Sequence, residues 1–145
     1  MSTIFVIYHS DTGNTHKLAR LVAEGIDSVK GAKATLVPAG ELDLAAAAKA
    51  DGYAIGSPDY FSYVAGEVKC FFDKILYDER FKGKPCVCFA THGGGGKVMS
   101  VLSALSKSCG LAEVAPGVAA QGAPGEKDAK DARDLGKALA KAAAG

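Results

Sequence analysis

Apolar residues follow two periodicities along this chain, and the two alternate. Residues 3–9 (TIFVIYH) form an apolar run rich in β-branched and aromatic side chains, without regularly spaced polar positions. Such a run is typical of a strand buried on both faces of a sheet. In residues 15–29 the large apolar side chains recur at helical spacing, at Leu18, Leu21, Val22, Ile26 and Val29. Gly31 then supplies a common helix stop. The chain therefore begins with a predicted strand and a predicted helix.

The same alternation continues to the last residue. Further strands are predicted at 32–38, 52–58 and 84–91, and helices at 41–50, 65–77, 97–110 and 126–145. Residues 112–120 predict a broken or edge strand, since Pro116 cannot donate a hydrogen bond to a central ladder. Five strands, each followed by a helix, favour an α/β fold in which a doubly wound parallel sheet has helices on both faces. No linker or repeat interrupts the pattern, so we expect a single domain over residues 1–145.

Composition and charge exclude several classes of function. The chain has 145 residues, of which 48% are hydrophobic and 23% are charged, as in ordinary globular domains. A formal net charge of +1 gives no electrostatic reason to expect nucleic acid or an acidic membrane surface as a partner. The apolar runs are too short to span a bilayer, and residues 1–10 lack the basic n-region of a signal peptide. We therefore expect a cytoplasmic protein without a membrane span.

The cysteines give no metal or disulfide signal. They follow neither the CxxC spacing nor a zinc-binding pattern, and free thiols are the rule in a reducing compartment. Cys86 and Cys88 lie two apart in a predicted strand and so share one face, where we expect them to fill the core as small apolar residues. The four positions are Cys70, Cys86, Cys88 and Cys109.

The strongest chemical signal is the polar loop between the first strand and the first helix, SDTGNT at residues 10–15. A helix N-terminus offers unpaired N–H groups and the positive end of the helix dipole, and together these bind anions. Gly13 lets the backbone approach an anion, and hydroxyls at Ser10, Thr12 and Thr15 can donate further hydrogen bonds. The loop lacks Lys and Arg and does not match GxxxxGK, so nucleotide hydrolysis is not expected. Taken alone, the loop is equally compatible with a simple polar helix cap.

Two later loops favour binding. The third strand ends in residues 56–69, which include Tyr60, Phe61 and Tyr63, and the fourth strand ends in residues 91–97 (THGGGGK). The carboxyl ends of parallel strands meet at one edge of a sheet. Exposed aromatic residues beside an anion site suggest a flat ring stacked on them, and a glycine run lets backbone N–H groups approach the edge of that ring. A phosphate cradle, an aromatic clamp and an open backbone together predict a flavin mononucleotide (FMN) site.

These motifs resemble those of flavodoxin-like FMN proteins over nearly the whole chain. Residues 10–15 match the family's phosphate fingerprint, Ser/Thr-x-Thr-Gly-x-Thr, and residues 56–74 (GSPDYFSYVAGEVKCFFDK) resemble its second FMN loop and the following helix. The second loop and ATHGGGGK are most similar to flavin-dependent quinone reductases of the tryptophan-repressor-binding-protein type. The resemblance implies a three-layer, five-stranded sheet in the order 2-1-3-4-5, with FMN at the switch point between the first and third strands.

The resemblance also implies a role for each loop residue. The phosphate would be bound by Ser10, Asp11, Thr12, Gly13, Asn14 and Thr15. The ring and its ribityl chain would be flanked by Ser57, Pro58, Asp59, Tyr60, Phe61, Ser62 and Tyr63. The other edge of the ring would be contacted by Thr91, His92, Gly93, Gly94, Gly95 and Gly96.

Three departures from the family pattern bear on function. Electron-carrying flavodoxins usually stack an aromatic residue of the third loop on the flavin, and THGGGG has none. They are also strongly acidic near the flavin, whereas the charges here nearly balance, with Asp11, Asp59 and Glu67 against Lys17, Lys69 and Lys97. Quinone reductases of the type named above carry an additional segment before the last strand, for which this chain has no room.

Two functions fit these observations. The first is electron transfer with a redox partner protein, which the short chain favours. The second is FMN-dependent reduction of quinones or similar acceptors by NAD(P)H, which the open glycine loop favours. A phosphoacceptor receiver domain is set aside. It would need an acidic pair after the first strand, an Asp at the end of the third strand and a Lys at the end of the fifth. This chain has His9-Ser10 and Ser57 at the first two places, and no Lys in residues 115–120. Near-neutral surroundings predict a flavin potential less low than that of acidic flavodoxins.

Overall fold

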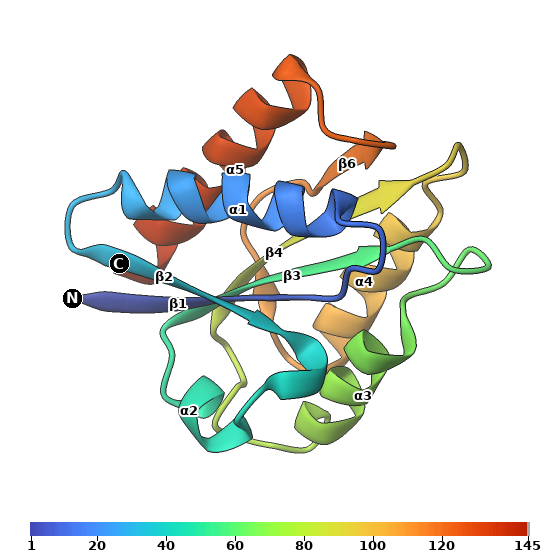
Figure 1. Ribbon diagram of the computed structural model, residues 1–145. Helices are drawn as coiled ribbons and strands as arrows, with labels where there is room; N and C mark the ends of the chain where they lie inside the picture. The colour runs from blue at the N-terminus through green and yellow to red at the C-terminus, as the bar shows by residue number, and fades with distance from the viewer. Residues whose placement is uncertain (145) are drawn as a thin grey trace.

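The computed structural model describes residues 1–144 and contains a parallel sheet with helices on both faces (Figure 1). The strands are β1 (Ser2–Tyr8), β2 (Ala32–Pro38), β3 (Gly52–Pro58), β4 (Pro85–His92), β5 (Ala112–Glu113) and β6 (Val118–Gln121). The helices are α1 (Asn14–Asp27), α2 (Leu44–Ala48), α3 (Gly66–Ile75), α4 (Val98–Ser108) and α5 (Glu126–Ala144), with a 3-10 helix η1 (Ala39–Glu41). Within these residues, no helix has both the length and the apolar character needed to cross a membrane.

All strand pairs are parallel, in the order β2-β1-β3-β4-β5, and β6 also pairs with β4. The predicted α/β fold class and strand order are therefore confirmed. β1 lies between β2 and β3, and the helices that follow β1 and β3 cover opposite faces of the sheet. Where the segments after two neighbouring strands turn to opposite faces of the sheet, a crevice forms beyond the carboxyl ends of those strands. The fold thus places a binding edge beyond β1 and β3.

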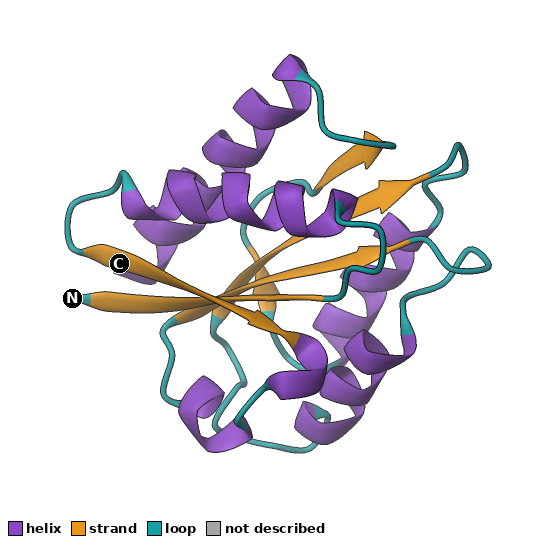
Figure 2. Cartoon of the chain, viewed as in Figure 1, coloured by secondary structure: helices purple, strands orange, loops and turns teal. Residues whose placement is uncertain are grey.

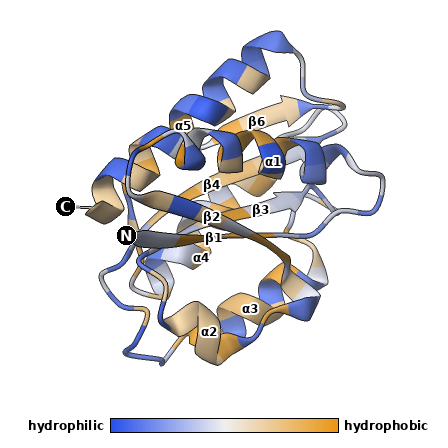
Figure 3. Ribbon diagram, turned by 60° about the vertical axis from the view of Figure 1, so that its left-hand side comes forward, coloured by the Kyte–Doolittle hydropathy of each residue, from blue (hydrophilic) through white to orange (hydrophobic). Residues whose placement is uncertain are grey.

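Two hydrophobic cores cover the two faces of the sheet. Ile4 and Val6 of β1 pack in one core with side chains of α1 and α5, whereas Ile7 packs in the other core with side chains of α2, α3 and α4. Burial on both faces explains why the strand sequences are continuous apolar runs. Figure 3 shows many hydrophilic residues on α1 and α5, the helices whose apolar side chains pack on one face of the sheet.

Two elements differ from the sequence prediction. The helix expected at 41–50 is replaced by η1 and the short α2, which starts where the Asp43 carboxylate accepts a hydrogen bond from the N–H of Ala45 at 3.1 Å. The fifth strand is two segments, β5 and β6, separated around Pro116, as its predicted break implied. The last helix was expected to reach residue 145, which lies outside the described residues.

The predicted loops leave the sheet at one edge, on the right in Figure 2. Tyr8 of β1 is in register with Gly56 of β3, and Pro58 of β3 with Thr91 of β4. The carboxyl ends of the three strands are therefore aligned along one edge of the sheet, which brings the loops after them together.

Candidate functional site

The first loop leads directly into the N-terminus of α1. Gly13 is the N-cap residue with φ 100°, a left-handed conformation that favours glycine. Its N–H donates to the Ser10 hydroxyl oxygen at 3.1 Å. The N–H groups of Asn14, Thr15 and His16 have no partner among residues 1–144, and a Cβ placed on Gly13 would meet no atom within 4 Å. This part of the loop is an open cradle of unpaired donors.

One cradle residue is tied to the third loop. The hydroxyl oxygens of Thr15 and Thr91 lie 2.7 Å apart, and both side chains are buried. One of the two hydroxyls donates to the other, so a proton remains available on only one of them. Thr12, by contrast, is exposed. The expected hydroxyls of the loop are therefore not equivalent, because Thr15 also has a structural contact.

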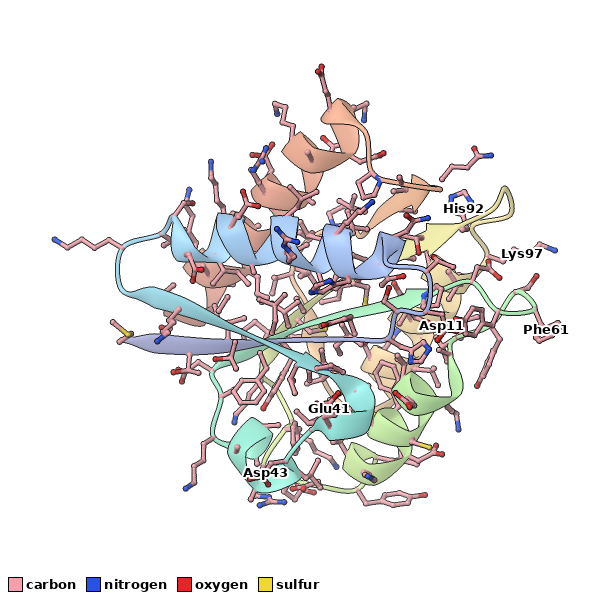
Figure 4. All side chains as sticks on the ribbon, viewed as in Figure 1. Asp11, Glu41, Asp43, Phe61, His92 and Lys97 are labelled. Atoms are coloured by element: carbon pink, nitrogen blue, oxygen red, sulfur yellow. The ribbon has the colours of Figure 1, made fainter. Side chains whose placement is uncertain are left out.

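The second loop is a tight hairpin. Tyr60 and Tyr63 exchange backbone hydrogen bonds of 2.9 Å, and the two residues between them, Phe61 and Ser62, have φ values of 58° and 64°. Left-handed residues at both central positions are the feature of a type I′ turn. A left-handed conformation is unusual for a bulky residue such as Phe. The Phe61 side chain is fully exposed at the tip and points away from the sheet (Figure 4).

Two residues of the second loop have their side chains occupied within the protein. Ser57 is buried; its hydroxyl donates to the Pro58 carbonyl at 2.7 Å and accepts from the Ala65 N–H at 2.9 Å. Asp59 accepts from the N–H of Ser62 at 2.7 Å and from that of Val98, the first residue of α4, at 3.2 Å. Ser57 and Asp59 thus position the hairpin, and the Ser57 hydroxyl does not face an open site.

The third loop exposes backbone. Gly93, Gly94 and Gly95 are exposed, and a Cβ on Gly93 would meet no atom within 4 Å. The His92 ring fixes the turn, since its Nδ1 accepts from the N–H of Gly94 at 3.0 Å. In that arrangement the neutral ring carries its proton on Nε2.

Sequence reasoning missed a fourth segment beside this loop. The N–H of Gly122 donates to the His92 carbonyl at 2.9 Å, and the Gln121 amide donates to the Gly93 carbonyl at 3.4 Å. Gln121 ends β6. The available signal was its place at the carboxyl end of the last predicted strand, where it joins the same edge as the other three loops.

A polar network joins the first two loops. The Tyr60 hydroxyl donates to the Asp11 carboxylate, and His9 lies between the carboxylates of Asp11 and Glu67, with N–O distances of 3.2 Å on both sides. The hydrogen bond from Tyr60 holds the pKa of Asp11 below its usual range, and His9 contributes less. Burial and the bond to Asp11 raise the pKa of Tyr60 to about 12. Tyr60 is therefore a protonated donor and Asp11 an ionised acceptor near neutral pH.

Two hollows lie near these loops. One of about 350 Å³ is lined by the first loop together with Tyr8, His16, Glu41 and Glu67. A larger one of about 590 Å³ lies between α1 and the start of α5, at Arg20 and Pro124. Within residues 1–144, no group of three or more His, Cys, Asp or Glu side chains is arranged to hold a metal ion.

The residues present fit a phosphate ester that carries a flat ring. The cradle offers three unpaired N–H groups, the hairpin offers partly exposed Tyr60 and Tyr63, and the third loop offers glycine backbone. The Asp11 carboxylate in the cradle loop would repel an anion, and its two oxygens are bonded to Tyr60 and His9.

Comparisons with known proteins identify the family. Residues 42–125 match the family model described as NADPH-dependent FMN reductase. A flavodoxin of Aquifex aeolicus is 38% identical over 110 residues, which cover 73% of this chain and 60% of that protein. The chain thus spans less than two thirds of that relative's length. An NAD(P)H dehydrogenase (quinone) of Archaeoglobus fulgidus is 30% identical over 188 aligned positions, covering 99% of this chain and 98% of the relative.

A solved structure extends the likeness to three dimensions. The flavodoxin, WrbA-like protein from Agrobacterium tumefaciens superposes with a TM-score of 0.85 at 26% identity, covering 99% of this chain and 98% of that one. The resemblance inferred from the three loops is therefore confirmed at the level of family and fold. The chain belongs to the NADPH-dependent FMN reductase family, and it is a flavin-binding redox protein with the flavodoxin-like fold.

Proposed function

We propose that the flavin is FMN and that its phosphate lies in the loop of residues 10–15. The observation that carries this proposal is the set of three N–H groups, those of Asn14, Thr15 and His16, without a partner among the described residues. N–H groups at a helix N-terminus are a common site for phosphate. The loop contains neither Lys nor Arg, which suits a phosphate that is held and not transferred. FMN supplies the redox chemistry when bound, and the protein supplies binding and orientation.

The ring would lie between the second and third loops. We assign Tyr60 and Tyr63 to its face, and His92 with Gly93 to Gly96 to its other edge. Ser57 and Asp59 would act by holding the hairpin in place, since their side chains bond to protein backbone. Phe61 would contribute only after a change of the hairpin, because its side chain points to solvent.

The function that this site supports best is electron transfer with a redox partner protein, carried out by residues 1–145 as one domain in the cytoplasm. Direct reduction by NAD(P)H, followed by reduction of a quinone or similar acceptor, is the second candidate. The observation that favours the second is the third loop, which has exposed glycines and no aromatic residue. Such a loop leaves room for a nicotinamide beside the flavin.

Titration of the apoprotein with FMN, riboflavin and FAD, followed by flavin fluorescence, tests the cofactor assignment. We expect FMN to bind at least about tenfold more tightly than riboflavin, which lacks the phosphate, because hydrogen bonds to charged groups contribute about 1.5–3 kcal/mol. T12E places a carboxylate in the cradle and should abolish this preference. T35E, the same change at an exposed position of β2, is the matched control. An unchanged FMN affinity in T12E would refute the cradle assignment.

Anaerobic mixing of the FMN-loaded protein with NADPH or NADH separates the two functions. Loss of flavin absorbance within seconds supports the oxidoreductase. Flavin that stays oxidised with both nucleotides, but is reduced by dithionite, supports the electron carrier.

A further inference from the structure

The imidazole of His9 lies just before the phosphate loop with a carboxylate at each of its nitrogens. Its Nε2 lies 3.2 Å from Asp11 Oδ1, and its Nδ1 lies 3.2 Å from Glu67 Oε2. The His9 side chain is only 19% exposed, whereas the two carboxylates are 65% and 53% exposed. A neutral imidazole carries one N–H and can donate to only one of these oxygens, while an imidazolium donates to both. The geometry is therefore complementary to the charged ring.

Among the other groups around His9, Glu41 adds to the negative charge. Glu41 of η1 lines the same hollow, as do His16 of α1 and Tyr8 of β1. The Tyr60 ring lies 6.0 Å from the His9 ring, centroid to centroid. Three carboxylates, two imidazoles and two phenols thus surround this corner of the site. When both imidazoles are neutral, the corner has a net negative charge.

Asp11 is the carboxylate of this group that lies in the phosphate loop itself. It is a member of the loop whose N–H groups are open to an anion, and a carboxylate repels a nearby phosphate. Its two oxygens are bonded to Tyr60 and to His9. These bonds fix the carboxylate, and of the two partners His9 is the one that can also offset its charge.

We propose that His9, as an imidazolium, is a positioning residue for the flavin phosphate: it holds and neutralises Asp11 and Glu67 beside the cradle, so that flavin binding is linked to a proton on His9. This inference rests on the proposed function, because it takes residues 10–15 as the phosphate site. An anion in the cradle favours the charged form of His9, so the contribution of His9 to affinity is present at low pH. A neutral ring would not make this contribution.

The test compares dissociation constants for FMN in wild type and H9Q from pH 5.5 to 8.5 at constant ionic strength. The phosphate of FMN also titrates in this range, but it does so with both proteins, and the ratio of their constants cancels it. At pH 5.5 we expect H9Q to bind FMN about threefold more weakly than wild type, or weaker still, because it lacks one partly screened positive charge. The ratio should approach one at pH 8.5. A ratio that is constant across the range overturns the proposal, since a purely structural role would give that result.

Further variants keep the test independent of the folding of H9Q. H9K carries its charge throughout the range, so its affinity relative to wild type should rise with pH. D11N and E67Q each remove a carboxylate that His9 offsets, so the effect of H9Q in either background should depend less on pH. E24Q makes the same charge change on α1, where Glu24 pairs with Arg133 at 3.3 Å, and should leave that dependence intact. An H9K affinity that stays in constant ratio to wild type would contradict the proposal. Failure of wild type to bind FMN at any pH would overturn the proposed function, and this inference with it.

Discussion

Thr15 and Thr91 place their hydroxyl oxygens 2.7 Å apart in a buried position, although 76 residues separate them in the chain. Thr15 lies in the first turn of α1 and Thr91 near the end of β4. The contact therefore holds the phosphate loop against the start of the glycine-rich loop. It adds a direct side-chain contact between two candidate FMN-binding loops that the strand register already brings together.

T15V tests this tie. Valine keeps the volume but leaves the Thr91 hydroxyl without its partner, which costs about 1–3 kcal/mol in a buried site. We expect urea unfolding to show a loss of that size, with weaker FMN binding. The T15V/T91V double variant removes both polar groups and should recover much of the stability but not the FMN affinity. A T15V variant as stable as wild type would show that the contact does not stabilise the fold.

Helices α1 and α5 approach each other through glycines. A Cβ on Gly136 would overlap the carbonyl oxygen of Val22, and a Cβ on Gly25 would overlap that of Arg133. G136A should therefore destabilise the protein by about 1–3 kcal/mol, the usual cost of overpacking. G66A at the start of α3, where a Cβ meets no atom within 4 Å, is the control and should be neutral or slightly stabilising. Equal unfolding midpoints for the two variants would contradict the close packing.

The hairpin at Tyr60 to Tyr63 contains a strained backbone that glycine relieves. Ser62 has a φ of 64°, and non-glycine residues in the left-handed region cost about 1 kcal/mol or more. S62G should therefore raise the free energy of unfolding, in contrast to S100G within α4, which should lower it by about 0.5–1 kcal/mol. Thermal or urea unfolding of the pair provides the measurement. If S62G is destabilised as much as S100G, the turn does not have this conformation in solution.

The thiols should differ sharply in reactivity. Burial raises the pKa of Cys86 to about 12 and also raises the pKa of Cys88 and Cys109, and the thiolate is the reactive form. Cys70 is exposed. At pH 8 a thiol reagent should label one cysteine rapidly in the native protein and four after unfolding, and C70S should abolish the rapid phase. Rapid labelling of a second cysteine would contradict the burial of Cys86, Cys88 and Cys109.

Much of the fold follows from local patterns in the sequence. The continuous apolar runs identify β1, β3 and β4 because both faces of these strands are buried, and helical spacing identifies α1, α3 and α4. The η1–α2 segment was predicted as one helix. Its alanine-rich sequence has little periodicity to mark where a helix starts. Asp43 caps α2, so the helix begins at Leu44 and not at residue 41.

The site was predictable in its loops and not in its contacts. Parallel strands end at one edge, so the three loops were expected to meet. The partners of polar side chains were not predictable, because they join distant positions. His9 meets Glu67 across 58 residues, and the Ser57 hydroxyl bonds to backbone eight residues on. No periodic signal in the sequence encodes such pairs.

The central claim is that the first turn of α1 binds the phosphate of FMN. Amide resonances in a ¹⁵N-labelled sample report on this directly, because the N–H groups of Asn14, Thr15 and His16 have no partner among residues 1–144 before binding. We predict that saturating FMN moves these three amide protons downfield, as expected for new hydrogen bonds to an anion, and that riboflavin at saturation leaves them nearly unchanged. FMN that binds while these three resonances stay in place would contradict the assignment of the loop.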